Sequence, residues 1–173
     1  GNGVTIFRNL APSTVIIRTA DDGLGSGVLI SKDGLIITNH HVIEKDDDSI
    51  FTEVELAFCP VDIDNLESVV IYKAQVKLID KTRDLALLQM HSPINNKISK
   101  VAKLESNKKA IQVGMDVHAI GNPVGEFCTY TQGVISQYRP NYEWEYSATS
   151  LHKAIVIQTQ TPINPGNSGG PLI

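Results

Sequence analysis

The sequence predicts an all-β protein, and three observations support this fold class. Short segments rich in valine, isoleucine and leucine recur at frequent intervals along the chain. Glycine-containing turns separate them, and almost no segment shows the apolar spacing of an amphipathic helix. The chain has 173 residues, of which 42% are hydrophobic. It can therefore bury one moderate core, or the cores of two small barrels that share an interface.

The first half of the chain contains a run of predicted strands. One or two helical turns are expected over residues 5–10, ending before Pro12. Residues 31–34, which read Ser-Lys-Asp-Gly, are a hairpin signal, and residues 80–83 form a second turn. The strands predicted around these turns cover residues 14–19, 25–30, 35–38, 53–58, 69–79 and 84–90.

The second half begins after a polar, lysine-rich segment over residues 98–113, which indicates a linker. We therefore expect an N-terminal domain over residues 1–105 and a C-terminal domain over residues 106–173. Gly133 is expected to mark a β-bulge. The predicted strands are residues 117–120, 130–136 and 154–159, the last of them buried.

Residues 138–152 are expected to form a surface loop. They hold four aromatic side chains among charged residues, with no helical period. No internal repeat or low-complexity segment interrupts the chain.

The composition excludes several classes of function. The net charge is −4 and no block of lysine or arginine stands out, which argues against nucleic-acid binding. No apolar run approaches the roughly 20 residues of a membrane-spanning helix. The N-terminus lacks the basic and apolar regions of a signal peptide, so we expect that none exists or that it was removed.

The cysteines, histidines and clustered aspartates show no spacing that is typical of a metal-binding site. Cys59 and Cys128 lie far apart and form no Cys-x-x-Cys pair, so two free thiols are favoured over one disulfide. The five histidines show no His-x-x-x-His spacing. Residues 46–48, three consecutive aspartates, are expected to form a solvated loop because a calcium site needs more widely spaced oxygen ligands.

Ser168 has the strongest functional signal in the chain. It lies among three glycines and between Pro165 and Pro171, in a run that reads Asn-Pro-Gly-Asn-Ser-Gly-Gly-Pro. Glycines permit backbone angles that side chains forbid, and prolines exclude a helix. We expect a tight loop that exposes the hydroxyl and gathers backbone N–H groups, as acyl transfer requires. An idle serine in a glycine-rich turn is the alternative.

A serine nucleophile needs a base and an acid that orients the base. His40 and His41 both follow a predicted strand, where they would face opposite ways, and either could be a surface histidine instead. Asp84 begins an apolar strand and is either a turn residue or a buried acid that orients a histidine. Asp80 and Asp116 are its rivals.

The serine run also satisfies Gly-x-Ser-x-Gly, the nucleophile elbow of α/β-hydrolases. That motif requires a helix directly after the serine and its partner residues further downstream. Here Pro171 follows within three residues and the sequence extends only to Ile173. The elbow interpretation is therefore rejected.

Five blocks together resemble the trypsin-like serine proteases, and among them the HtrA/Deg-type bacterial branch. The blocks occur in the family's order and cover most of the chain from Ser13 onward. They are residues 25–42 (GSGVLISKDGLIITNHHV), 84–88 (DLALL), 121–123 (GNP), 131–136 (TQGVIS) and 163–172 (INPGNSGGPL).

The resemblance implies two antiparallel Greek-key β-barrels with the active site in the cleft between them. It assigns the base to His41, the orienting acid to Asp84 and the nucleophile to Ser168. The oxyanion donors would be the backbone N–H groups of Gly166 and Ser168. The implied reaction is hydrolysis of polypeptides through an acyl-enzyme, without a metal or an organic cofactor.

Two residues separate this sequence from the digestive relatives. Val42 follows His41 where those enzymes carry a disulfide cysteine, and Asn167 precedes Ser168 where they carry an aspartate that pairs with a newly freed N-terminus. Activation by N-terminal cleavage is therefore not expected. The acid-free run over residues 160–164 indicates a preference for small or medium apolar P1 residues. The candidates for lining the P1 pocket are Thr161, Pro162 and Ile163.

Family members continue past the Pro-Leu pair with two more strands, so the second barrel is expected to be incomplete in this sequence. We expect a piece of a longer protein, or a barrel that a partner chain completes. A catalytically inactive peptide-binding module and an esterase are the alternative functions. The resemblance also implies a periplasmic or secreted location, and a possible homo-oligomer or downstream domain.

Overall fold

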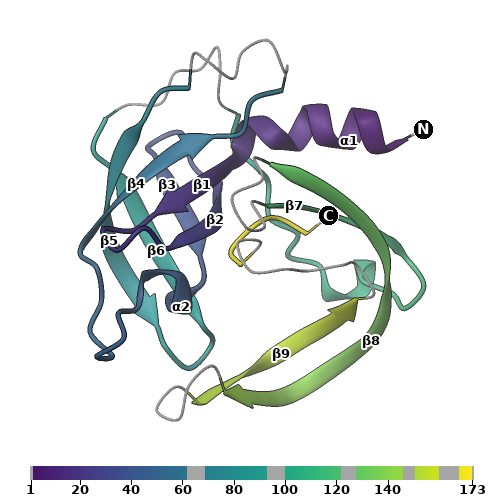
Figure 1. Ribbon diagram of the computed structural model, residues 1–173. Helices are drawn as coiled ribbons and strands as arrows, with labels where there is room; N and C mark the ends of the chain where they lie inside the picture. The colour runs from purple at the N-terminus through teal and green to yellow at the C-terminus, as the bar shows by residue number, and fades with distance from the viewer. Residues whose placement is uncertain are drawn as a thin grey trace.

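The computed structural model describes residues 2–61, 69–92, 100–121, 128–145, 151–159 and 168–172. A closed barrel lies beside a second, more open sheet, and the N-terminal helix extends along the side of that sheet (Figure 1). The all-β fold class predicted from the sequence is confirmed, with one barrel closed and the second sheet partial.

Six antiparallel strands close the first barrel in the order β1-β2-β3-β6-β5-β4. All six were expected from the sequence, although the fifth begins three residues later than predicted and the sixth begins after Asp84. Their bounds are β1 (Thr14–Arg18), β2 (Leu24–Leu29), β3 (Leu35–Thr38), β4 (Glu53–Phe58), β5 (Tyr72–Asp80) and β6 (Leu85–Met90).

The core of this barrel follows from the alternation of side chains along its strands. In β6 the second, fourth and sixth residues are buried and the others are not, as expected for one face turned inward. Gly34 closes the β2–β3 hairpin at φ 89°, a left-handed angle that favours glycine. The inward side chains include Val15, Ile17, Leu29, Ile36, Leu56, Ala86 and Leu88.

Two helical segments precede the barrel. Helix α1 (Asn2–Leu10) begins earlier than the helical turns expected over residues 5–10, and the 3-10 helix η1 (Ala11–Ser13) follows it. Pro12 lies at the start of η1, where its missing N–H costs nothing. None of the helices in the described part of the chain is long and apolar enough to cross a membrane.

The second sheet has the strand order β7-β8-β9. Its strands are β7 (Asp116–Gly121), β8 (Thr129–Glu145) and β9 (Leu151–Thr159), and the 3-10 helix η3 (Lys108–Ala110) lies in the expected linker. Near the C-terminus, Leu172 forms an isolated antiparallel bridge with Ala119 of β7. This bridge brings the segment that contains Ser168 onto the second sheet.

The prediction of a surface loop over residues 138–152 is wrong for its described residues, 138–145 and 151–152, which lie in strands. Strand β8 continues to Glu145 and pairs with β9, so that Tyr142 lies opposite Ala154 and Trp144 opposite His152. The prediction of a β-bulge at Gly133 is also wrong, because Gly133 pairs with Val117 in a regular register. The register shifts lie further along β8. They interrupt the two-residue alternation of side chains between the faces of the strand, so the sequence of this segment does not show the pattern of a strand.

Strand β9 is not the buried strand that the sequence predicted. Leu151 and Ile155 are 59% and 51% exposed, and only His152 among its described side chains is fully buried. An apolar run in a sequence cannot distinguish a strand inside a core from one in a ribbon with an open face.

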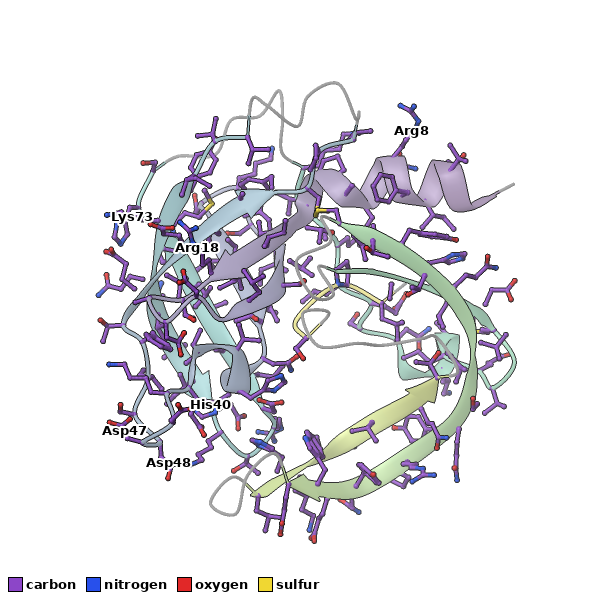
Figure 2. The ribbon with its side chains drawn as sticks, viewed as in Figure 1. Arg8, Arg18, His40, Asp47, Asp48 and Lys73 are labelled. Carbon is purple, nitrogen blue, oxygen red and sulfur yellow. A yellow bond between two sulfur atoms is a disulfide. The ribbon has the colours of Figure 1, made fainter. Side chains whose placement is uncertain are left out.

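The prediction of two free thiols is also wrong. Cys59 and Cys128 form a disulfide, with their Cα atoms 5.7 Å apart (Figure 2). The two cysteines are separated by 69 residues, so only the fold brings them together. They belong to a second apolar cluster, which packs β1 against β7 beneath α1 and consists of Ala11, Ile16, Cys59, Ile120 and Cys128, with Phe7, Leu10 and Val61 at its edge.

The three consecutive aspartates lie in an exposed loop, as predicted. Asp47 and Asp48 lie at the outer edge of the first barrel, on the side away from the second sheet (Figure 2). Asp47 Oδ1 accepts a hydrogen bond from the Ser49 N–H at 3.1 Å, which closes a local turn.

Candidate active site

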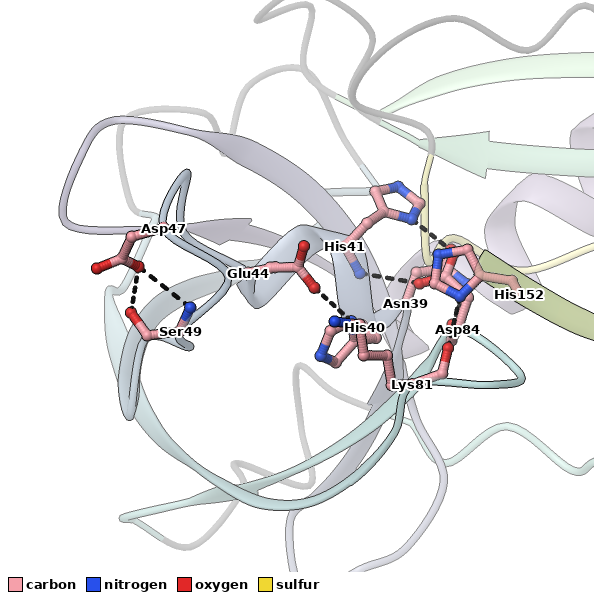
Figure 3. A network of polar contacts seen from close by, with 9 residues as sticks. All are labelled: Asn39, His40, His41, Glu44, Asp47, Ser49, Lys81, Asp84 and His152. Carbon is pink, nitrogen blue, oxygen red and sulfur yellow. Dashed lines mark hydrogen bonds and ion pairs between the residues drawn. The ribbon is translucent and has the colours of Figure 1, made fainter. Parts of the chain in front are cut away.

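The two adjacent histidines occupy a single helical turn rather than a strand end. Strand β3 ends at Thr38, and helix α2 (His40–Ile43) follows directly. Successive residues of a helix point about 100° apart, so the two imidazoles still diverge. His40 enters the core of the first barrel, whereas His41 lies toward Asp84 (Figure 3).

His41 and Asp84 make two direct contacts. The Nδ1 atom of His41 lies 2.6 Å from Asp84 Oδ2, and the backbone N–H of His41 donates to Asp84 Oδ1 at 2.9 Å. A carboxylate only accepts hydrogen bonds, so Nδ1 carries the proton and a neutral His41 has Nε2 unprotonated. The two contacts fix both the ring orientation and the tautomer that a general base requires.

Asp84 lies in the turn before β6 and not within the strand. Its φ is 57°, a left-handed angle that aspartate tolerates better than most residues. The side-chain amide of Asn39 donates to the Asp84 carbonyl at 2.8 Å, which ties this turn to the end of β3. The sequence offered two interpretations of Asp84, and the residue has both properties: it is a turn residue and it is buried.

The electrostatics of Asp84 favour its anion. The residue is only 3% exposed. Burial alone would raise the pKa of its carboxyl, but the hydrogen bonds and the charge of His41 outweigh burial and hold the pKa below its ordinary value. Asp84 is therefore a carboxylate at neutral pH.

His40 differs from its neighbour in its surroundings. It is 2% exposed, and its Nδ1 lies 3.0 Å from Glu44 Oε2. Burial lowers the pKa of His40, and the negative charges of Glu44 and Asp84 only partly compensate. His40 is thus a neutral core residue at pH 7. It is turned away from Asp84, the orienting acid that the family resemblance implies.

Ser168 joins the same end of the first barrel through its backbone. The N–H of Ser26, on β2, donates to the Ser168 carbonyl at 2.8 Å, and Thr38 Oγ1 donates to the Ser26 carbonyl at 2.8 Å. Thr38 pairs with Ala86 of β6. The ends of β2, β3 and β6 therefore bring the segments that carry Ser168, His41 and Asp84 together.

Gly169 explains how closely this segment approaches the barrel. Its φ is 87°, and a Cβ atom there would lie 2.0 Å from the Ser26 carbonyl oxygen and 2.3 Å from Thr38 Oγ1. Only glycine fits such a contact. The oxyanion donor Gly166 and the P1 candidates Thr161, Pro162 and Ile163 lie outside the described residues.

Sequence reasoning missed two groups that shape the site. Asn39 supports the Asp84 turn, and its place directly before the two histidines was the only available signal. His152 comes from β9 and carried no signal, because the sequence placed it in the surface loop expected over residues 138–152. Within the described ranges, no three histidine, cysteine or acidic side chains are grouped to hold a metal ion.

Comparison with known proteins identifies the fold that carries this geometry. A family model described as "Trypsin-like peptidase domain" matches residues 25–173. The chain belongs to the trypsin-like peptidase family. The region that matches the family model begins within β2 and includes His41, Asp84 and Ser168.

Individual relatives agree with this assignment. The peptidase chain is 37% identical to "Protease Do-like 1, chloroplastic" of Arabidopsis thaliana over 98% of its length. It is 40% identical to a "Probable periplasmic serine endoprotease DegP-like" of Pseudomonas fluorescens over 86% of its length. It superposes on the crystal structure of Deg5 with a TM-score of 0.74 and 29% identity, covering 98% of this chain and 78% of that one.

These relatives confirm the resemblance to the HtrA/Deg type, so the chain carries a serine-protease domain of that type. The trypsin-like domain spans only part of the relatives, 38% of the chloroplast protein and 26% of the Pseudomonas protein.

Proposed function

We propose that this domain is a serine endopeptidase in which Ser168 is the nucleophile, His41 the general base and Asp84 the orienting acid. The observation that carries the proposal is the 2.6 Å contact between His41 Nδ1 and Asp84 Oδ2. It lies beside a serine segment that is hydrogen-bonded to the neighbouring strand β2. The family assignment supports peptide-bond hydrolysis as the reaction.

The proposed reaction follows from these roles. His41 Nε2 accepts the proton of the Ser168 hydroxyl as its oxygen attacks the peptide carbonyl. Asp84 stabilises the imidazolium that forms, and the backbone N–H groups of Gly166 and Ser168 stabilise the oxyanion. His41 then protonates the leaving amine, which gives the acyl-enzyme. A water molecule deprotonated by His41 hydrolyses the ester and restores the serine.

The substrates would be polypeptides with a small or medium apolar P1 residue, bound beside Thr161, Pro162 and Ile163. The support is the absence of an acidic side chain from residues 160–164, since a cationic P1 residue needs a negative partner. A digest of a peptide library should give cuts after valine, alanine or leucine. Cuts mainly after lysine or arginine would contradict this specificity. Oligomerisation and a downstream domain stay predictions.

The nucleophile is tested with a fluorophosphonate probe, which reacts with activated serines. The probe should label the wild-type protein at Ser168, and Ser168→Ala should abolish labelling. Ser106→Ala, at an exposed serine in the segment before β7, is the matched control and should label normally. Absence of labelling in the folded wild-type protein would overturn the proposal. Binding of peptides without cleavage would then favour the inactive binding module.

The acid is tested by the rate of peptide hydrolysis. Asp84→Asn should lower the rate constant of peptide hydrolysis by about 10⁴-fold, because the amide favours the wrong tautomer of His41. Asp116→Asn, at the exposed first residue of β7, should change the rate by less than about threefold. Comparable losses in both variants would count against the assignment of Asp84.

A further inference from the structure

Strand β9 contacts the turn that carries Asp84. The Nδ1 atom of His152 lies within hydrogen-bonding distance of the Lys81 carbonyl oxygen. The next residue, Lys153, donates its backbone N–H to the Thr82 carbonyl at 2.7 Å. Two successive residues of the second sheet thus hold two successive carbonyls of the first barrel. Figure 3 shows the first of these contacts, between His152 and Lys81.

The Lys81 carbonyl is shared between this contact and the turn itself. It also accepts the backbone N–H of Asp84 at 3.3 Å, which closes the turn over residues 81–84. A carbonyl has two lone pairs and can accept both donors. The His152 contact therefore shares its acceptor with the hydrogen bond that closes this turn, whose last residue is the left-handed Asp84, φ 57°.

His152 is fully buried, which makes this contact well defined. Its exposed fraction is 0%. The Trp144 ring lies against it from β8, with centroids 5.3 Å apart. Because the carbonyl cannot donate, Nδ1 carries the proton, and Nε2 is a buried atom with no partner among the described residues. An unpaired buried polar atom is unfavourable, so packing alone would favour an apolar residue here.

We propose that His152 is a positioning residue of the active site: through the Lys81 carbonyl, the β8–β9 ribbon holds the turn over residues 81–84 so that the Asp84 carboxylate faces His41. The ribbon belongs to the second sheet, whereas the Asp84 turn joins two strands of the first barrel, so this contact makes the geometry of the acid depend on the position of the second sheet. The role rests on the proposed protease function, although the Asp84–His41 contact can be measured without it.

The first test compares two substitutions. His152→Leu removes the donor, whereas His152→Asn keeps an N–H group at the same number of bonds from Cα. The fluorophosphonate labelling rate should fall about tenfold or more in His152→Leu, because small displacements of catalytic groups are costly. The midpoint of its pH profile should move as well, and His152→Asn should recover most of both. Ile155→Ala, at an exposed site on the same strand, is the control and should behave as wild type.

The second measurement needs no substitution and no activity. In the ¹⁵N NMR spectrum of the wild-type protein, His152 should be protonated at Nδ1, and the His41 Nδ1 proton should resonate far downfield. That downfield signal should weaken or shift in a folded His152→Leu variant and return in His152→Asn.

The outcomes separate the two proposals. A wild-type protein that fails to react with the probe overturns the protease function, while the NMR signals still test the positioning role. A His152 protonated at Nε2 in the wild type overturns the positioning role, even if His152→Leu does not fold. So does a folded His152→Leu variant with the labelling rate, pH midpoint and His41 signal of wild type.

Discussion

Asp84 combines an unusual backbone conformation with the role that we propose for the orienting acid. Its left-handed φ turns the carboxylate back toward α2, where it receives two hydrogen bonds from His41. Asn39 stabilises the same turn through the Asp84 carbonyl. A non-glycine residue with a left-handed backbone is stable only where several surrounding contacts hold it in place. For Asp84, those contacts come from the groups of the candidate site.

Gly169 gives a prediction about a single residue. Gly169→Ala should displace the Ser168 segment from β2, because the new methyl group overlaps the Ser26 carbonyl. We expect the fluorophosphonate labelling rate to fall by about 10²-fold or more. Gly114→Ala is the matched control: Gly114 also has a left-handed φ, 92°, but no described heavy atom lies within 4 Å of its added Cβ. It should cost about 1–2 kcal/mol of stability and leave the rate unchanged.

His40 gives a prediction about pH. Its pKa is lowered by burial in the folded state, so the unfolded chain binds a proton more readily below about pH 6.5. Stability is therefore complete above that pH and falls as the pH decreases toward the lowered folded pKa. Replacing His40 with leucine should flatten the decline in unfolding temperature between pH 7 and pH 5. His91→Gln, at a 42% exposed side chain, should keep the wild-type slope.

The strands show how far local pattern determines each element. In the first barrel, buried side chains alternate with more exposed ones along β3 and β6, although both strands are largely apolar runs in the sequence. In the second sheet, two register shifts in β8 break that alternation. Its aromatic side chains then stack along the ribbon, with the Tyr142 and Trp144 centroids 6.0 Å apart, instead of entering a core. Such a segment resembles a loop in sequence although all of its described residues lie within β8 or β9.

Strand β6 allows a test of its inward face with one residue type. Leu88 is fully buried and Leu85 is 41% exposed. Leu88→Ala should reduce the free energy of unfolding by about 2–5 kcal/mol, through lost transfer energy and the cavity left behind. Leu85→Ala should reduce it by less than about 1 kcal/mol. Equal losses, measured by urea denaturation, would show that the face of β6 is assigned wrongly.

At the scale of the molecule, the second apolar cluster and its disulfide join the barrel to the second sheet. Cys59 follows β4 and Cys128 precedes β8, so the bond links one half of the site to the other. Together with the contact of β9 on the Asp84 turn, it gives the first barrel and the second sheet two points of attachment. We expect the relative position of Ser168 and His41 to depend on both.

Removal of the disulfide should be costly because the loop it closes is long. For a separation of 69 residues, loss of the link should destabilise the protein by about 4 kcal/mol in the chain-entropy model. The double variant Cys59→Ser/Cys128→Ser, or reduction with dithiothreitol, should lower the unfolding temperature. Labelling at Ser168 should slow before unfolding begins. An unchanged unfolding temperature after complete reduction would contradict this account.

The sequence by itself determined the all-β class, the first-barrel strands and the residue types of the site. Alternating apolar residues, glycine turns and the Asn-Pro-Gly-Asn-Ser-Gly-Gly-Pro run are local properties that need no partner. The choice of His41 over His40 came from the resemblance to a family, and residue spacing alone left it open. The catalytic roles of His41, Asp84 and Ser168 stay predictions that the experiments above test.

Only the tertiary structure decided which distant residues meet. The Cys59–Cys128 link, the Asn39 support of Asp84 and the contact of His152 with the Lys81 carbonyl each join residues from separate segments of the chain. The burial that makes His40 neutral and the extended pairing of β8 with β9 also depend on segments far along the chain. Contacts of this kind depend on the closure of the first barrel and on the packing of the second sheet against it. No local sequence pattern predicts the closure or the packing.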